Sequence, residues 1–308
     1  MDKKFSGVSQ TMSRFRGWIQ AGATLLTNLH LPNFLKGGLY QGAGKTVCVP
    51  GLNCYSCPAA SGACPIGAFQ AVVGSSKFSF SYYITGFLIL LGVLLGRFIC
   101  GFLCPFGWFQ ELLHKIPTKK FSTKKLKPLT YLKYAVLLVM VFLLPAFLVN
   151  DVGMGNPFFC KYLCPQGVLE GAIPLSLANS GIRAALGKLF TWKFSILLSV
   201  IALSVLFYRP FCKWLCPLGA FYALFNRVSL FQMKVDKNKC VSCGKCAKAC
   251  KMDVDVTKTP NHTECIRCGM CIRACPTKAV CFRYGFGDGK DKTNVAEMPQ
   301  KNKDNKEK

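Results

Sequence analysis

Nineteen of the 308 residues are cysteines, and most of them lie three or four positions from another cysteine. Two runs near the C-terminal end have the spacing C-x2-C-x2-C-x3-C. They consist of Cys240, Cys243, Cys246 and Cys250, followed by Cys265, Cys268, Cys271 and Cys275. Thiolates at this spacing hold [4Fe-4S] clusters. Zinc sites use two separated cysteine pairs instead, so the runs predict two iron–sulfur clusters.

The fourth cysteine of each run is expected to bind the other run's cluster, because the first three already wrap one cubane. One cluster is then held by Cys240, Cys243, Cys246 and Cys275, and the other by Cys265, Cys268, Cys271 and Cys250. Gly244 and Gly269 lie inside the runs, where a residue without Cβ lets the backbone approach the sulfurs. The pattern is that of bacterial two-cluster ferredoxins and predicts a small α+β domain over residues 233–286.

A second pattern, Cys-x3-Cys-Pro-x-Gly, occurs three times, at Cys100/Cys104, Cys160/Cys164 and Cys212/Cys216, and Cys64 carries its Cys-Pro-x-Gly half. Cysteines four residues apart share one face of a helical turn. Proline after the second cysteine favours the start of a new helix. The free N–H groups of that helix then suit an anionic cluster. Three copies argue against buried cysteine pairs that arose by chance.

Each pair offers only two ligands, so two pairs must meet to hold a cubane. Cys100/Cys104 and Cys212/Cys216 follow apolar segments that are expected to end at the same membrane face, which predicts a third cluster. Cys160/Cys164 are expected at the opposite face, together with the segment 48–64. A fourth cluster is predicted there from Cys160, Cys164, Cys64 and either Cys57 or Cys54, with Cys57 as the candidate. The sequence gives no role to Cys48 or Cys281.

The elements that must position these cysteines are apolar stretches at 18–35, 82–102, 131–149 and 192–208. A bilayer core of roughly 30 Å is crossed by about 20 apolar residues in a helix. The stretches therefore predict an all-α membrane domain of about four transmembrane helices over residues 1–232. Residues 287–308 are rich in Gly, Lys and Asn, which predicts a disordered polar tail.

The charge balance favours a membrane protein over a nucleic-acid-binding protein. Hydrophobic residues make up 51% of the chain, yet 39 Lys and Arg stand against 13 Asp and Glu. Many basic residues lie beside the apolar stretches and not along one amphipathic face, so we expect no nucleic-acid partner. Their distribution predicts a multi-pass protein of the cytoplasmic membrane, with both termini and the ferredoxin domain in the cytoplasm.

From residue 15 to 285 the chain resembles the NapH/NosR-type membrane-bound 4Fe-4S proteins, also called membrane polyferredoxins. The resemblance rests on the Cys-x3-Cys-Pro motifs and the C-terminal two-cluster runs, and it departs in the segment NCYSCPAASGACPIG. It implies electron relay between the quinone pool or a flavoprotein and a partner redox protein. Two alternatives stay open. One is a quinol dehydrogenase subunit, which is an enzyme, and the other is a redox sensor or metalloenzyme assembly factor.

Overall fold

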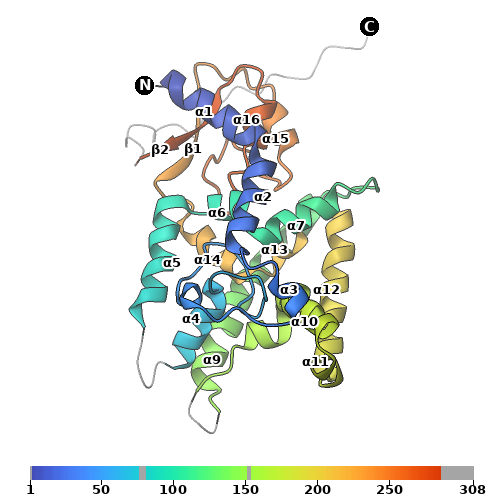
Figure 1. Ribbon diagram of the computed structural model, residues 1–308. Coiled ribbons are helices and arrows are strands. Elements are labelled where there is room, and N and C mark those ends of the chain that lie inside the picture. Colours follow the sequence, from blue (N-terminus) through green and yellow to red (C-terminus); the bar gives the residue numbers. More distant parts are fainter. Residues whose placement is uncertain (1, 76–80, 151–153, 286–308) are drawn as a thin grey trace.

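The computed structural model describes residues 2–75, 81–150 and 154–285 (Figure 1). The predicted tail at 287–308 lies outside the described residues. Figure 1 shows a small module that contains both strands at one end of the molecule, and helices that extend away from it. We call residues 231–285 the C-terminal module.

In the part of the chain that the structure describes, two helices are long and apolar enough to cross a membrane: residues Leu126–Phe147 and α12 (Lys188–Leu206). The first comprises α8 (Leu132–Val136), the π-helical η3 (Leu137–Leu143) and α9 (Leu144–Phe147) after the end of η2 (Lys124–Tyr131). Only 28% and 17% of their apolar windows are buried. Most of these side chains therefore face outward, as in helices that contact lipid and unlike the core helix of a soluble domain.

The other two predicted spans are interrupted. α5 (Tyr82–Leu95) ends at Gly96, which has a φ of 54° in the left-handed region, and α6 (Phe98–Phe102) follows it. α2 (Arg16–Thr27) ends where the Asn53 side chain donates to the Thr27 carbonyl at 3.2 Å. The short α3 (Asn33–Lys36) lies beyond it. Residues 2–75, 81–150 and 154–285 thus contain two helices of spanning length where the sequence predicted about four.

The remaining helices are short, and several begin at a proline that follows a cysteine. They are η1 (Ala43–Thr46), α4 (Pro65–Gly74), α7 (Pro105–His114), η4 (Phe159–Leu163), η5 (Gly167–Ala172), α10 (Ile173–Ala178), α11 (Ser180–Ala184), α13 (Pro210–Trp214) and α14 (Pro217–Phe225). Cys64, Cys104 and Cys216 have extended backbones directly before α4, α7 and α14. Proline restricts the preceding residue in this way and suits the first helical position.

The C-terminal module is the predicted small α+β unit. β1 (Phe231–Val235) pairs antiparallel with β2 (Val280–Tyr284), and α15 (Lys245–Ala249) and α16 (Met270–Ala274) lie between the strands in sequence. α1 (Asp2–Arg14) packs against β2 and α16, and the Phe282 N–H donates to Ser9 Oγ at 3.0 Å. The N-terminal helix, which the sequence placed in the membrane domain, thus covers this module.

The module is docked on the helices through backbone contact and buried ion pairs. An ideal Cβ on Gly101 of α6 would lie 2.3 Å from the Ile266 carbonyl oxygen, so only glycine permits this approach. Arg97 pairs with Glu264 at 3.0 Å, and Lys213 pairs with Asp253 at 3.0 Å. The loop before Cys268 therefore lies directly against the turn that carries Cys100.

We predict that Gly101→Ala lowers the thermal unfolding midpoint in detergent, because its methyl group meets backbone that cannot move aside. The expected cost is about 1–3 kcal/mol. Gly86→Ala in α5 is the matched control, since nothing lies within 4 Å of its added Cβ. Alanine in a helix is also favoured over glycine by roughly 0.5–1 kcal/mol. Equal midpoints for the two variants would contradict the tight docking.

Candidate metal centres

Four segments repeat one local structure around a cysteine. The thiols of Cys64, Cys104, Cys164 and Cys216 each accept a hydrogen bond from the backbone N–H of the glycine three residues later. The distance from Gly219 N to Cys216 Sγ is 3.3 Å. These N–H groups lie in the first turn of the following helix, where the helix supplies no acceptor. Each repeat therefore offers a ready donor to a thiolate, as the Cys-Pro-x-Gly motif predicts.

We call Cys100, Cys104, Cys212 and Cys216 the near site, because it lies next to the C-terminal module. The Cys216 thiol interacts electrostatically with the other three, and Cys104 interacts with Cys212 and Cys100. All four are buried. α6 carries Cys100 and α13 carries Cys212. The structure thus brings together the four residues that the sequence paired.

We call Cys54, Cys64, Cys160 and Cys164 the far site. They line a cavity of about 520 Å³. The Cys160 thiol interacts with those of Cys164, Cys64 and Cys54. Ala60 stands four residues before Cys64, where the other three repeats have a cysteine. The preceding loop therefore places Cys54 beside the three thiols of the repeats.

Of the two alternatives for the fourth cysteine, Cys57 and Cys54, the structure places Cys54 in this group and the candidate Cys57 outside it. Cys57 does not line the cavity. Its thiol donates to Asn28 Oδ1 at 3.6 Å, and its side chain is buried with Ala59 and Ala60. The contact with Asn28, which follows α2, holds Cys57 away from the cavity. Nothing in the local sequence spacing indicates that contact.

The two cysteines without a predicted role lie in different places. Cys48 lines the far-site cavity as a fifth thiol, interacts with Cys64 and forms a β-bridge with Ala63. Cys281 lies on β2 opposite Lys234. All nineteen cysteines lie in the described part of the chain, and none of them forms a disulfide.

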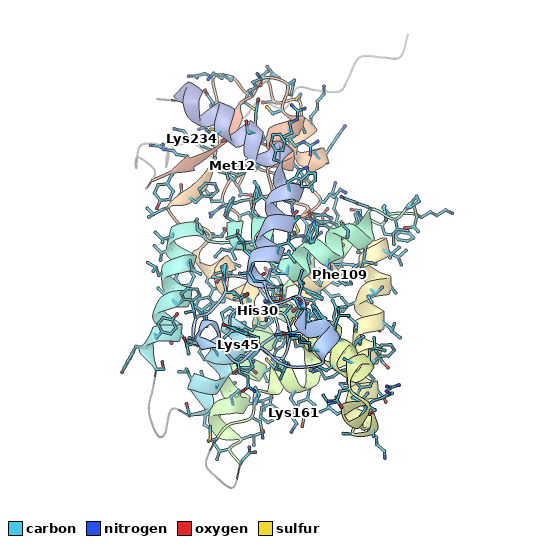
Figure 2. The ribbon with its side chains drawn as sticks, in the orientation of Figure 1. Met12, His30, Lys45, Phe109, Lys161 and Lys234 are labelled. Atoms are coloured by element: carbon cyan, nitrogen blue, oxygen red, sulfur yellow. The ribbon has the colours of Figure 1, made fainter. Side chains whose placement is uncertain are left out.

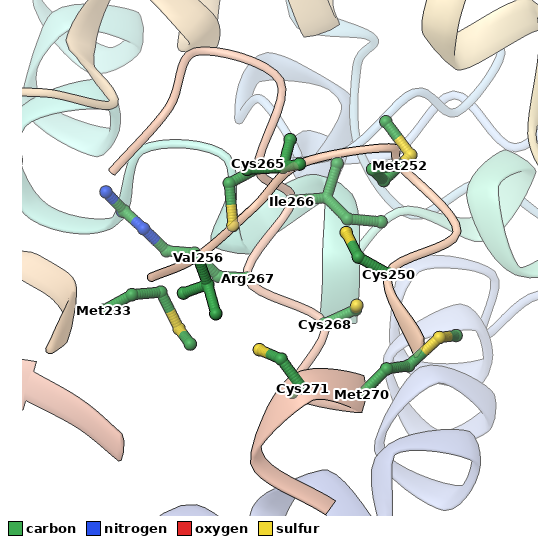
Figure 3. A pocket seen from close by; sticks show the side chains of 12 residues that line it. Met233, Cys250, Met252, Val256, Cys265, Ile266, Arg267, Cys268, Met270 and Cys271 are labelled. Carbon is green, nitrogen blue, oxygen red and sulfur yellow. The ribbon is translucent and has the colours of Figure 1, made fainter. Parts of the chain in front are cut away.

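We call Cys250, Cys265, Cys268 and Cys271 the proximal ferredoxin site. These four line one cavity in the C-terminal module, and Figure 3 shows their side chains around it. Burial raises the pKa of Cys271, and the charges of Cys268, Cys265 and Cys250 raise it further. Cys250 comes from the first run and joins three cysteines of the second, which is the exchange that the spacing predicts.

The distal ferredoxin site contains the other four predicted ligands, Cys240, Cys243, Cys246 and Cys275. Cys246 and Cys275 interact electrostatically, while Cys240 and the exposed Cys243 lie on the loop before α15. Burial favours the neutral Cys275 thiol, but hydrogen bonds from Thr277 and from the Ala279 N–H outweigh it and lower its pKa. The thiolate form that binds iron is thereby favoured.

Glycine is required inside both cysteine runs. Gly244 and Gly269 have φ values of 69° and 76°, and they directly precede α15 and α16. A side chain at either position would be strained in this left-handed conformation. The two glycines that the sequence singled out therefore shape both cluster-binding loops.

Buried positive charge tests whether the near site fits an anionic cluster. Arg97 and Arg209 are both 0% exposed and interact electrostatically with Cys100 and with Cys212, respectively. Among the described residues, neither Nη2 has a hydrogen-bond partner. Guanidinium nitrogens that are buried without an acceptor are costly unless further negative charge lies beside them. Thiolate-bound iron–sulfur clusters supply such charge, so the residues fit [4Fe-4S].

The same region buries more cations than carboxylates. The basic side chains are Arg16, Arg97, Lys133, Arg209, Lys213 and Arg267, and their acidic neighbours are Glu111, Glu264 and Asp253. Burial favours the neutral form of Glu111, but Arg209 and Arg16 outweigh it and lower its pKa to about 2. Even with every carboxylate ionised, positive charge remains for the clusters to balance.

Within the described ranges, no three His, Cys, Asp or Glu side chains come close enough to hold a single metal ion.

Family models agree with this arrangement. A model described as a 4Fe-4S binding domain matches residues 62–82, 79–124, 133–173 and 189–238, and one described as a 4Fe-4S dicluster domain matches 232–276. These matches include every Cys-Pro-x-Gly segment and both ferredoxin runs. The chain belongs to the NapH/NosR-type family of 4Fe-4S proteins. Its cofactors are [4Fe-4S] clusters, and it is an iron–sulfur electron-transfer protein of this family.

Individual relatives cover parts of the chain. It is 32% identical over 209 residues to an uncharacterized protein of Methanocaldococcus jannaschii, which is 65% of this chain and 77% of that protein. The methylamine utilization ferredoxin-type protein MauN of Paracoccus denitrificans is 27% identical over 60% of this chain and 56% of its own. The ferredoxin-type protein NapH of Haemophilus influenzae is 26% identical over 35% of this chain and 52% of its own. No solved structure matches.

We predict that Cys54→Ser lowers the iron content of the anaerobically purified protein by about four per chain, the loss of one [4Fe-4S] cluster. Cys57→Ser is the matched control and is expected to keep all its iron, because Cys57 points to Asn28. Iron and acid-labile sulfide analysis measures both variants. Loss of iron from Cys57→Ser with full retention in Cys54→Ser would reverse the assignment.

Proposed function

We propose that this protein carries single electrons across a membrane, between a quinol or flavoprotein on one side and a redox protein on the other, through four [4Fe-4S] clusters. The observation that carries the proposal is that the four cysteine groups lie in series, each joined to the next by a short protein contact. Bound clusters supply the one-electron chemistry. The chain holds them in order and shields them from water.

The first link joins the two ferredoxin sites. The fourth cysteine of each run belongs to the site formed by the other run. One apolar core is bordered by cysteines of both sites, namely Cys246, Cys265, Cys271 and Cys275. Ile272 and Val256 are buried in that core. Dry apolar packing between the two groups supports direct exchange of electrons inside the module.

The second link joins the module to the near site. Gly101 lies between Cys100 and Cys104, and an added Cβ there would meet the Ile266 carbonyl at 2.3 Å and the Cys268 nitrogen at 3.7 Å. The backbone next to Cys100 of the near site thus touches the backbone next to Cys268 of the proximal ferredoxin site. Ile266 itself is buried at this junction.

The third link joins the near and far sites through two consecutive residues. The Leu52 N–H donates to the Cys104 thiol, and the Asn53 N–H donates to the Cys64 thiol. Tyr222 is fully buried beside them and donates to the Pro50 carbonyl at 3.0 Å. Two neighbouring amides therefore connect ligands of different sites.

The orientation in the membrane is also part of the proposal. In Figure 2, Lys234 of the C-terminal module and Lys161 lie toward opposite ends of the molecule. The basic residues Lys115, Lys119, Lys120 and Lys124 lie in or near the loop whose Thr123 contacts Asp253 of the module. The positive-inside rule then supports a cytoplasmic module, with both termini on that side.

The far-site cavity favours a small, membrane-soluble donor at the opposite end. Besides the cysteines, its lining combines apolar residues such as Ala68, Ala71 and Ile84 with polar residues such as Lys45 and Lys193. A cavity with an apolar wall and a few polar groups suits a quinol better than a flavoprotein surface. Quinol-dependent bleaching of the clusters in membranes tests this, and it also tests whether the protein acts as a quinol dehydrogenase in its own right.

The module supports an acidic partner at the cytoplasmic end. Within residues 231–285, all of which the structure describes, acidic side chains are mostly buried or half-buried, and Asp236, whose side chain is 37% exposed, pairs with Lys239. The exposed basic residues there are Lys237, Lys239, Lys245, Lys248, Lys251, Lys258, Arg273 and Lys278. Several of them adjoin ligands of the distal ferredoxin site. Charge of one sign around a redox centre steers a partner of opposite sign.

We predict about sixteen irons per anaerobically purified chain and four separate potentials in an EPR-monitored redox titration. Near eight irons, with only ferredoxin-type signals, would refute both membrane-domain clusters. Cys100→Ser provides the internal check, since it is expected to remove one signal and leave the ferredoxin signals unchanged.

We predict that the double variant Lys245→Glu/Lys248→Glu slows electron transfer to an acidic plant-type ferredoxin about tenfold at low salt. The reversed charges repel the probe, and added salt is expected to shrink the difference. Stopped-flow oxidation of the reduced protein measures the rate. Arg183→Glu/Lys188→Glu, at exposed positions in α11 and at the start of α12, is the charge-matched control at the opposite end of the molecule (Figure 1). A neutral quinone as acceptor is expected to show no effect. Equal rates for both double variants would exclude docking at the module.

A further inference from the structure

The four Cys-Pro-x-Gly repeats share a further position, six residues after the cysteine. It is occupied by Gln70, Gln110, Glu170 and Tyr222. Each of these side chains bonds to a different segment, and the two glutamines make the same contacts in the two membrane-domain sites. The local signal is the shared string Pro-x-Gly-x-Phe-Gln at 65–70 and 105–110.

Gln110 joins the near site from α7. Its Nε2 donates to Cys212 Sγ at 3.1 Å, and its Oε1 accepts from the Phe211 N–H at 3.2 Å. The side chain is 0% exposed. One amide therefore contacts a ligand sulfur and the backbone that carries this ligand.

Gln70 repeats this arrangement in the far site from α4. Its Nε2 donates to Cys160 Sγ at 3.2 Å, and its Oε1 accepts from the Phe159 N–H at 3.0 Å. It too is 0% exposed. Cys160 and Cys212 are each the first cysteine of a full motif. The two glutamines therefore make equivalent contacts in the two sites.

The orientation of each amide is fixed by its partners. If the amide were flipped, Nε2 would face the backbone N–H of Phe159 or Phe211, so two donors would meet. Oε1 would then face the electron-rich sulfur. The observed orientation satisfies both groups, so each glutamine presents its N–H to the thiolate.

We propose that Gln70 and Gln110 are equivalent positioning residues that raise the reduction potentials of the far and near clusters, respectively. The inference rests on the proposed function, since it requires clusters at both sites. An N–H bond to a ligand sulfur stabilises the reduced state more than the oxidised state, because the reduced cluster carries more negative charge. The burial of both amides keeps water from replacing this donor.

The test is an EPR-monitored redox titration of Gln110→Leu and Gln70→Leu in the full-length protein. Gln110→Leu is expected to disfavour reduction of the near cluster about tenfold, which is roughly 59 mV for one electron. The far cluster is expected to keep its potential. Gln70→Leu is expected to do the reverse, so each variant controls for the other. Gln41→Leu, at an exposed glutamine, serves as the neutral control.

A second variant separates tuning from scaffolding. Gln110→Glu keeps an oxygen to accept the Phe211 N–H but, once ionised at alkaline pH, loses the donor and adds negative charge. Its near-cluster potential is expected to fall at least as far as in Gln110→Leu, with iron content unchanged. Leucine variants with full iron content and unshifted potentials would overturn the inference. So would loss of about four irons from both Gln110 variants, which marks a purely structural role. Absence of membrane-domain clusters from the unmodified protein would instead refute the proposed function.

Discussion

Burying thiolates among apolar helices requires hydrogen-bond donors and positive charge close to the sulfurs. The Cys-Pro-x-Gly segments meet the first need, because in each of them a glycine N–H in the first turn of the following helix donates to the cysteine three residues earlier. Arg97 and Arg209 meet the second need around the near site. Most other features of the architecture follow from this requirement. They include the short, interrupted helices and the buried ion pairs that contact the C-terminal module.

The ion pairs between the C-terminal module and the helices involve side chains that also interact with the near-site thiols. Glu264 pairs with Arg97 and Lys133, and Glu111 pairs with Arg16 and Arg209. Arg97, Lys133 and Arg209 also interact with near-site thiols. The cations that balance the cluster thus hold the module against the helices, so the electrostatics of the metal centre and the docking of the module cannot be separated.

Local sterics explain why much of the site could be predicted from the sequence. Proline after Cys64, Cys104 and Cys216 fixes both the extended cysteine and the helix start, whatever the tertiary surroundings. The ligand exchange between ferredoxin runs follows from loop length alone. By contrast, the choice of Cys54 over Cys57 depends on Asn28, which is distant in sequence. The packing of α1 on β2 likewise joins segments that are far apart in the sequence, and no local sequence pattern indicates it.

The interleaving of the four repeats has a consequence for biogenesis. The far site takes its cysteines from the segments around Cys64 and Cys164, and the near site takes its cysteines from those around Cys104 and Cys216, so the segments of the two sites alternate along the chain. A nascent chain that has emerged only as far as α12 has no complete near site. The N-terminal helix must in turn wait for β2 before it finds its packing surface. Completion of the near site therefore follows synthesis of Cys216, and closure of the module follows synthesis of β2.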